Sequence, residues 1–100
     1  TNKNIRRRLS QKLYVKPMNL RQLEAFKATI QAGSISGAAE LLNISQTSVS
    51  CLVSDLERSV RFPLFAKKGR GLVATPEARQ FFKAVETMFI GIDSLKTTAE

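Results

Sequence analysis

The sequence lacks the residues on which many enzymes and metal sites depend. It contains no histidine and no tryptophan, and its only cysteine is Cys51. A single cysteine excludes an internal disulfide, and without histidine a Cys/His metal site is not expected. No Ser/Lys pair, paired carboxylates or phosphate-binding loop stands at a catalytic spacing. We therefore expect neither an enzyme nor a bound cofactor.

Long apolar runs are missing as well. No stretch of about 18 consecutive apolar residues occurs, so we expect no membrane-spanning helix. The basic residues at the start are not followed by the apolar segment of a secretory signal. Together with the lone cysteine, these absences agree with a protein of the reducing cytoplasm.

Acidic residues are scarce in one part of the chain only. The formal net charge is +8, from 16 basic and 8 acidic residues. Six of the basic residues precede Pro17, and no acidic residue stands among them, so residues 1–17 carry most of the excess. We expect residues 1–17 to form a flexible basic extension. The alternative is an arm that lies along DNA phosphates or in a minor groove.

Helical signals begin after this extension. Asn19 followed by Gln22 is a capping-box pattern, and apolar residues then recur at helical spacing. Gly33 is a typical residue just after a helix end. We expect Ser36 to cap the next, short helix, and Asn43 to turn the chain because asparagine tolerates a left-handed backbone.

The segment 38–52 has the pattern of a helix-turn-helix. Small Ala39 allows two helices to cross closely, and Ser45 is expected to cap a second helix that ends near Val60. Apolar residues form the inner face of the motif: Leu42, Ile44, Val49 and Leu52. The polar residues left on the second helix point outward: Gln46, Thr47, Ser50, Cys51 and Ser54. A helix so placed can enter the major groove of DNA.

The outer face of that second helix carries no positive charge. Neither lysine nor arginine occurs from Ser45 to Leu56, so the helix cannot make the bidentate contact with guanine. Gln46 can pair with adenine, and the methyl group of Thr47 can pack on thymine, so we expect a readout that favours A·T pairs. Serine hydroxyls on this face are better suited to phosphates.

Cations for the phosphates must therefore come from elsewhere. The β-capable runs 64–67 and 71–74 flank Lys68-Gly69-Arg70 and predict a small hairpin, the wing. Arg70 is the best candidate for a minor groove. The full set of expected DNA-binding residues is Ser34, Ser36, Ser45, Gln46, Thr47, Ser50, Cys51, Ser54, Lys67, Lys68 and Arg70.

A long final helix is predicted from Thr75-Pro76-Glu77, which combines a cap, a proline in the first position and an acid in the first turn. Two overlapping apolar stripes follow, and a single surface helix needs only one. We expect the second to contact another copy of the chain, with Gly91 tolerated where two helices cross closely. The expected dimer interface is Phe81, Val85, Met88, Phe89, Ile92 and Leu95.

These patterns predict a mainly α fold: a winged helix-turn-helix with a small two-stranded wing and a long C-terminal linker or dimerisation helix. The expected division is a basic extension at 1–17, a winged helix-turn-helix domain at 18–75, and the linker or dimerisation helix at 76–100. Two other classes compete with a DNA-binding module of this kind. One is a winged helix that binds a protein, and the other is a regulator of a different winged-helix family, such as a molybdate-responsive one.

Several motifs resemble the N-terminal domain of LysR-type transcriptional regulators over Met18 to about Leu95. They are Met18–Phe26, Gly33–Leu42, Ile44-Ser45-Gln46, Leu56-Glu57, Pro63-Leu64-Phe65 and Gly69-Arg70-Gly71, and the opening is similar to the octopine and nopaline catabolism branch. The resemblance implies a homodimer, joined through the long helix, that binds double-stranded DNA at an interrupted inverted repeat. It also implies a small-molecule inducer, bound only by a C-terminal domain that is absent from this chain.

The chain departs from the pattern of that family at three places. Thr47 stands where the family often has proline, and Cys51 where it often has a basic or amide residue. Both changes bear on the base contacts, and Cys51 could also act as a redox switch, although a lone cysteine is usually inert. Val60-Arg61-Phe62 replaces the usual Leu-Gly turn, which bears on the direction of the wing.

Overall fold

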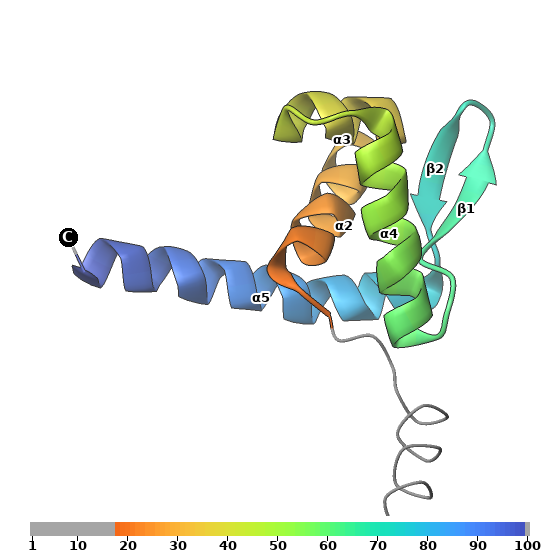
Figure 1. The fold of residues 1–100 in the computed structure, drawn as a ribbon. Helices are drawn as coiled ribbons and strands as arrows, with labels where there is room; N and C mark the ends of the chain where they lie inside the picture. The colour runs from red at the N-terminus through yellow and green to blue at the C-terminus, as the bar shows by residue number, and fades with distance from the viewer. Residues whose placement is uncertain (1–17, 100) are drawn as a thin grey trace, which may run out of the picture.

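The computed structural model describes residues 18–99 (Figure 1). The helices are α2 (Leu20–Ala32), α3 (Ile35–Leu42), α4 (Gln46–Val60) and α5 (Pro76–Ala99), and the strands are β1 (Phe65–Lys68) and β2 (Gly71–Ala74). Helices α2, α3 and α4 form a bundle with the hairpin beside α4, and α5 crosses the base of the bundle and extends beyond it. The architecture is the predicted winged helix-turn-helix. The prediction of a basic extension at 1–17 lies outside the described residues.

Short-range side-chain hydrogen bonds begin α2 where the sequence predicts. The Gln22 N–H donates to Asn19 Oδ1 at 2.9 Å, and the Asn19 N–H donates to Gln22 Oε1 at 3.3 Å, which completes the capping box of α2. Gly33 ends α2 with φ 74°, and Asn43 ends α3 with φ 55°. The left-handed backbone expected at both positions is therefore confirmed.

The predicted cap of α3 is wrong by two residues. Ser34, not Ser36, is the N-cap, because its extended backbone lets Oγ accept a hydrogen bond from the Gly37 N–H at 3.0 Å. Gly37 is required for this tight start. A Cβ at position 37 would lie 2.8 Å from the Ala32 Cβ, a distance that real side chains do not adopt.

The core is centred on Phe26, which is fully buried in α2. Its ring lies 5.7 Å from that of Phe65 in β1, and 5.5 Å and 6.0 Å from those of Phe81 and Phe82 in α5. Tilted and edge-to-face rings at these distances are favourable beyond the area that they bury. One aromatic side chain therefore joins α2, the wing and α5.

The wing is an antiparallel hairpin in which Lys68 pairs with Gly71 and Phe65 with Ala74. Strand β1 begins one residue later than predicted, at Phe65, and Leu64 lies fully buried just before it. The turn contains Gly69 at φ 61°, a conformation that glycine adopts without strain.

Helix α4 ends at Arg61, a non-glycine residue with φ 64°. Its N–H donates to the Glu57 carbonyl at 2.8 Å, so the left-handed conformation is imposed by the helix end. We expect Arg61→Gly to raise the free energy of unfolding by about 0.5–1 kcal/mol, because glycine relieves the strain at some cost in chain entropy. The shift in urea midpoint measures it.

Arg58→Gly, one turn earlier in α4, is the matched control. There the backbone is helical, so glycine is expected to lower the free energy of unfolding by about 1 kcal/mol. A loss of stability in both variants would contradict the strain assigned to Arg61.

Candidate nucleic-acid interface

The N-terminal half of α4 presents a polar face to solvent. Ser45 caps the helix, with its Oγ accepting from the Ser48 N–H at 3.0 Å and donating to Ser48 Oγ at 2.8 Å. Val49, Val53 and Leu56 are buried against the bundle. All five residues predicted on the outer face are exposed: Gln46, Thr47, Ser50, Cys51 and Ser54.

The predicted inner face of the helix-turn-helix is only partly buried. Leu42, Ile44 and Leu52 pack against the core at intermediate exposure, and together with Arg21 and Glu24 they line an open groove of about 290 Å³. Sequence reasoning did not find this groove. It lies between α2, the end of α3 and the middle of α4, and none of the predicted DNA-binding residues lines it.

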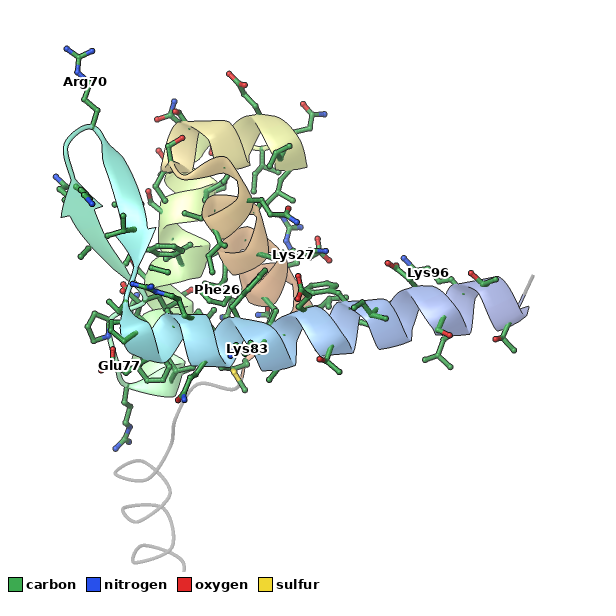
Figure 2. The ribbon with its side chains drawn as sticks, turned by 180° about the vertical axis from the view of Figure 1, so that it is seen from behind. Phe26, Lys27, Arg70, Glu77, Lys83 and Lys96 are labelled. Carbon is green, nitrogen blue, oxygen red and sulfur yellow. The ribbon has the colours of Figure 1, made fainter. Side chains whose placement is uncertain are left out.

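The wing is fixed to the turn between α2 and α3. The Leu72 N–H of β2 donates to the Gly33 carbonyl at 3.0 Å. Gly71 allows this approach, because a Cβ there would lie 3.0 Å from the same oxygen. The three predicted cations of the wing are all exposed: Lys67, Lys68 and Arg70. Arg70 extends from the tip of the wing, away from α5 (Figure 2).

A groove of about 460 Å³ lies between the wing and the first turns of α3 and α4. It brings together five of the predicted residues: Ser34, Ser36, Gln46, Lys67 and Arg70. The remaining lining consists of Ile35, Gly69, Gly71 and Leu72, so no acidic residue lines it. The groove suits a polyanionic strand, because two cations and two hydroxyl groups line it and no acidic side chain lies among them.

A further groove of about 260 Å³ lies between the middle of α4 and the wing. Ser50, Ser54 and Lys67 line it, together with Glu57. The other predicted DNA-binding residues are exposed but line neither groove: Ser45, Thr47, Cys51 and Lys68.

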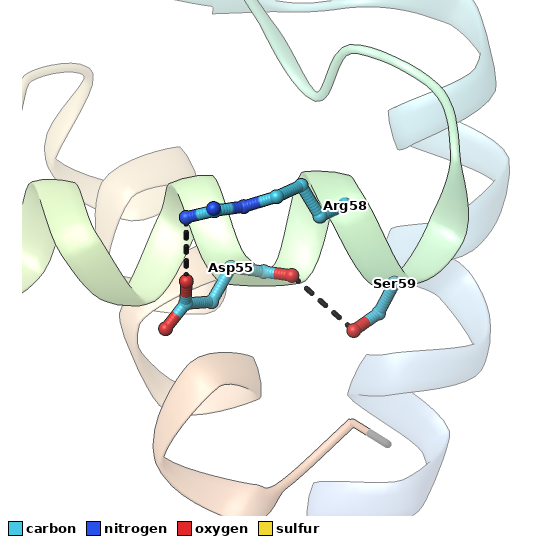
Figure 3. Close-up of polar contacts among 3 residues, drawn as sticks. All are labelled: Asp55, Arg58 and Ser59. Atoms are coloured by element: carbon cyan, nitrogen blue, oxygen red, sulfur yellow. Dashed lines mark hydrogen bonds and ion pairs between the residues drawn. The ribbon is translucent and has the colours of Figure 1, made fainter. Parts of the chain in front are cut away.

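Two charged residues in the last two turns of α4, Asp55 and Arg58, pair with each other within the helix. Arg58 Nη2 donates to Asp55 Oδ1 at 2.7 Å, and Ser59 Oγ donates to the Asp55 carbonyl at 3.2 Å (Figure 3). The Arg58 side chain is 73% exposed, so water screens this ion pair and its contribution to stability is small.

Much of the predicted dimer face of α5 is used inside the protomer. Val85 is buried in the core, Phe81 packs on Phe26, and Phe89 lies beneath Lys27, whose Nζ is 4.7 Å from the ring centroid. Leu95 is 71% exposed, and no atom outside the helix's own local backbone lies within 4 Å of a Cβ built at Gly91.

The open part of α5 has two unlike sides. Residues at spacings of four, three and four form a side of small and apolar groups: Ala84, Met88, Gly91 and Leu95. A charged side carries Arg79, Lys83, Glu86 and Asp93, with Ile90 alone among them at 64% exposure. Sequence reasoning missed Ile90, because its position does not belong to either apolar stripe.

No group of three potential metal ligands occurs within residues 18–99. In the same range, no helix is both long enough and apolar enough to cross a membrane.

This geometry defines a winged helix-turn-helix domain with a cationic groove beside α4, the second helix of the helix-turn-helix. A model of the family described as "Bacterial regulatory helix-turn-helix protein, lysR family" matches residues 20–79. The chain belongs to this family.

Curated relatives of the chain are regulators by name. It is 37% identical over 82 residues to the octopine catabolism/uptake operon regulatory protein OccR of Rhizobium meliloti. It is 43% identical over 84 residues to the transcriptional regulator DgcR of a Pseudoalteromonas species. These matches cover 82% and 83% of the chain but only 28% of each relative, so the chain spans about a quarter of their length.

Solved structures share the fold. The DNA-binding domain of BenM, in complex with benA site 1 DNA, matches with a TM-score of 0.77 and 27% identity over 82% of the chain and 95% of BenM's. The DNA-binding domain of CbnR, also in a DNA complex, matches with a TM-score of 0.72 and 26% identity over 82% of the chain and 97% of CbnR's. The described residues therefore have the fold of a lysR-family DNA-binding domain.

Proposed function

We propose that this chain binds double-stranded DNA sequence-specifically, as part of a bacterial transcription regulator, with α4 in the major groove and the wing in the adjacent minor groove. The observation that carries the proposal is the 460 Å³ groove, in which Gln46 of α4 faces the same space as Lys67 and Arg70 of the wing. A base-reading amide and phosphate-binding cations thus adjoin one cavity. The DNA complexes of BenM and CbnR support this reading.

Base discrimination is assigned to the uncharged face of α4. Gln46 and Thr47 are exposed in its first turn, the part of a recognition helix that approaches base edges. Their chemistry favours adenine and thymine. The proposed contacts with the DNA backbone are completed by Lys68 and by four serines: Ser34, Ser36, Ser45 and Ser50. Cys51 and Ser54 lie on the same exposed face of α4 as Gln46.

The proposed dimer forms through the small and apolar side of α5. Of the predicted interface, Leu95 is exposed, and four residues are partly exposed: Phe81, Met88, Phe89 and Ile92. Gly91 leaves room for a second helix. Val85 is excluded because the protomer's own core buries it. Two copies joined in this way would present two recognition helices to an interrupted inverted repeat.

The remaining parts of the proposal concern the whole regulator. We expect it to act in the cytoplasm, without catalysis or a cofactor, and without contact with membranes. Its small-molecule inducer would bind a separate C-terminal domain. The similarity to the octopine catabolism/uptake operon regulatory protein OccR and to the regulatory protein NocR supports this role.

Replacing Gln46 with alanine is expected to weaken sequence discrimination while leaving non-specific affinity unchanged. The test compares a duplex selected from a random pool with its scrambled form, using fluorescence anisotropy at several salt concentrations. Loss of one bidentate base contact lowers the specificity ratio by about 10- to 100-fold, and the slope of log K against log salt does not change.

Gln80→Ala is the matched control, because Gln80 is an exposed glutamine on α5. It should leave the specificity ratio as in the wild type. An equal ratio for Gln46→Ala would contradict the proposed base contact. Absence of binding to any duplex at low salt would instead favour a winged helix that binds a protein.

Leu95→Glu is expected to abolish dimer formation, because it places a charge within the apolar side of α5. Ile90→Glu is the matched control, since Ile90 is similarly exposed but lies on the charged side. Sedimentation equilibrium should give a dimer for the control and a monomer for Leu95→Glu. The opposite result would assign the interface to the other side of the helix.

A further inference from the structure

Glu57 is held in a contact that the local sequence does not require. It lies near the end of α4 at intermediate burial, and its Oε2 accepts a hydrogen bond from the Leu64 N–H at 2.7 Å. Leu64 is fully buried and immediately precedes β1. A hydrogen bond to a carboxylate is shorter and roughly twice as strong as one between neutral groups. The recognition helix thus holds the first strand of the wing directly.

Leu64 also joins the two ends of the wing. The Thr75 N–H donates to the Leu64 carbonyl at 3.0 Å, and Thr75 Oγ1 donates to the Pro63 carbonyl at 2.7 Å. Thr75 Oγ1 also accepts from the Ala78 N–H at 3.2 Å, in the first turn of α5. Residues 63–64 and 75 therefore form a hydrogen-bonded junction at the base of the wing, and Glu57 connects this junction to α4.

Small rotations at the base of the wing are large at its tip. A strand of four residues is about 13 Å long, so a tilt of roughly 10° moves the tip by about 2 Å. Hydrogen bonds to phosphate tolerate only a few tenths of an ångström around 2.9 Å. The hydrogen bond from the Leu72 N–H to the Gly33 carbonyl fixes the wing to the α2–α3 turn and not to α4.

We propose that Glu57 is a positioning residue for DNA binding, whose carboxylate fixes the angle between the recognition helix and the wing. It touches no DNA itself. It keeps the wing cations in register with Gln46, so that α4 and the wing engage adjacent grooves together. The consequence for DNA rests on the proposed function, whereas the angle of the wing does not.

The angle can be measured without DNA. Cys51 is an exposed free cysteine on α4, and Lys68→Cys adds a second labelling position on the wing. Pulsed electron spin resonance between two nitroxides on the 100-residue chain should give a narrow distance distribution. Glu57→Ala is expected to broaden it, and Glu86→Ala, at an exposed acid of α5, leaves it unchanged.

Two further variants separate the reach of the side chain from its charge. Glu57→Gln keeps the acceptor at the same distance and is expected to retain the narrow distribution. Glu57→Asp keeps the charge but withdraws the carboxylate by one methylene, and is expected to broaden it. An unchanged distribution in both Glu57→Ala and Glu57→Asp would overturn the proposal, even if both lower the melting temperature.

DNA binding supplies the second readout, measured well below the melting temperature on an A·T-rich duplex of about three turns. Glu57→Asp should reduce the magnitude of the salt slope by roughly two, because misdirected wings neutralise fewer phosphates. An unchanged slope overturns the effect on DNA binding. If the wild type binds no duplex, the proposed function fails, and the spin-label distances still decide the role of Glu57.

Discussion

Replacing Phe26 with alanine is expected to lower the free energy of unfolding by about 3–5 kcal/mol, as large-to-small changes at buried aromatic residues do. Its ring is fully buried and lies within 6.0 Å of three other phenylalanine rings. The cavity would open where α2, β1 and α5 meet, and no single element can move to fill it. Domains of this size have a total stability of only about 5–10 kcal/mol, so most of it would be lost.

Urea unfolding followed by circular dichroism measures this loss. Leu41→Ala is the matched control, since Leu41 is 61% exposed on α3 and should change stability by less than about 0.5 kcal/mol. A loss below about 1 kcal/mol for Phe26→Ala would show that the core is not centred on this side chain.

Removing the three wing cations together is expected to reduce affinity for any duplex by about 10³-fold at physiological salt. Two copies of Lys67, Lys68 and Arg70 would neutralise about six phosphates, which corresponds to a contribution of roughly −5 to the slope of log K against log salt. The triple alanine variant should lose this contribution. Sequence preference, which we assign to α4, should remain in whatever binding is left.

A triple variant of α5 controls for net charge. Arg79, Lys83 and Lys96 are all exposed and lie on the helix that Figure 2 shows on the opposite side from the wing tip. Changing these three to alanine removes the same charge but should weaken binding less than about 10-fold. Equal losses in the two variants would mean that total charge, and not contact by the wing, controls affinity.

The parts of the fold that depend on neighbouring residues could be predicted from the sequence. Asn19 with Gln22, Gly33 and Asn43 mark helix ends through contacts that span at most four residues. Their signals are local, so the sequence contains all the information needed. The exception is α3, where two serines are available for one cap and Ser34 accepts the hydrogen bond from the Gly37 N–H.

Contacts between distant residues could not be predicted in the same way. The bond from Glu57 to Leu64 depends on how the chain turns after α4, and the bond from Leu72 to Gly33 joins segments about forty positions apart. Neither has a periodic signal. The left-handed Arg61 could not be inferred for a similar reason, since arginine has no preference for that conformation.

The candidate site was predicted as a list of residues rather than as a shape. Exposure on α4 follows from helical periodicity, so Gln46 and its neighbours were identified from the sequence. Their approach to the wing depends on the tertiary structure, which places Gln46, Lys67 and Arg70 around one groove. On α5, periodicity identified apolar positions but could not divide them between the protomer's core and its open face.

The proposed placement of the DNA-binding cations on the wing and of the base-reading side chains on α4 would have a consequence for how such a regulator changes during evolution. Gln46, Thr47 and Ser50 are uncharged and exposed, so we expect substitutions there to alter neither the fold nor the proposed electrostatic attraction of the wing to DNA. A duplicated gene could therefore acquire a new operator through one or two changes while its product still scans the chromosome as before. Changes in the wing would instead alter affinity for every operator together. Substitutions in α4 would therefore change which operator is bound, and substitutions in the wing would change how fully every operator is occupied.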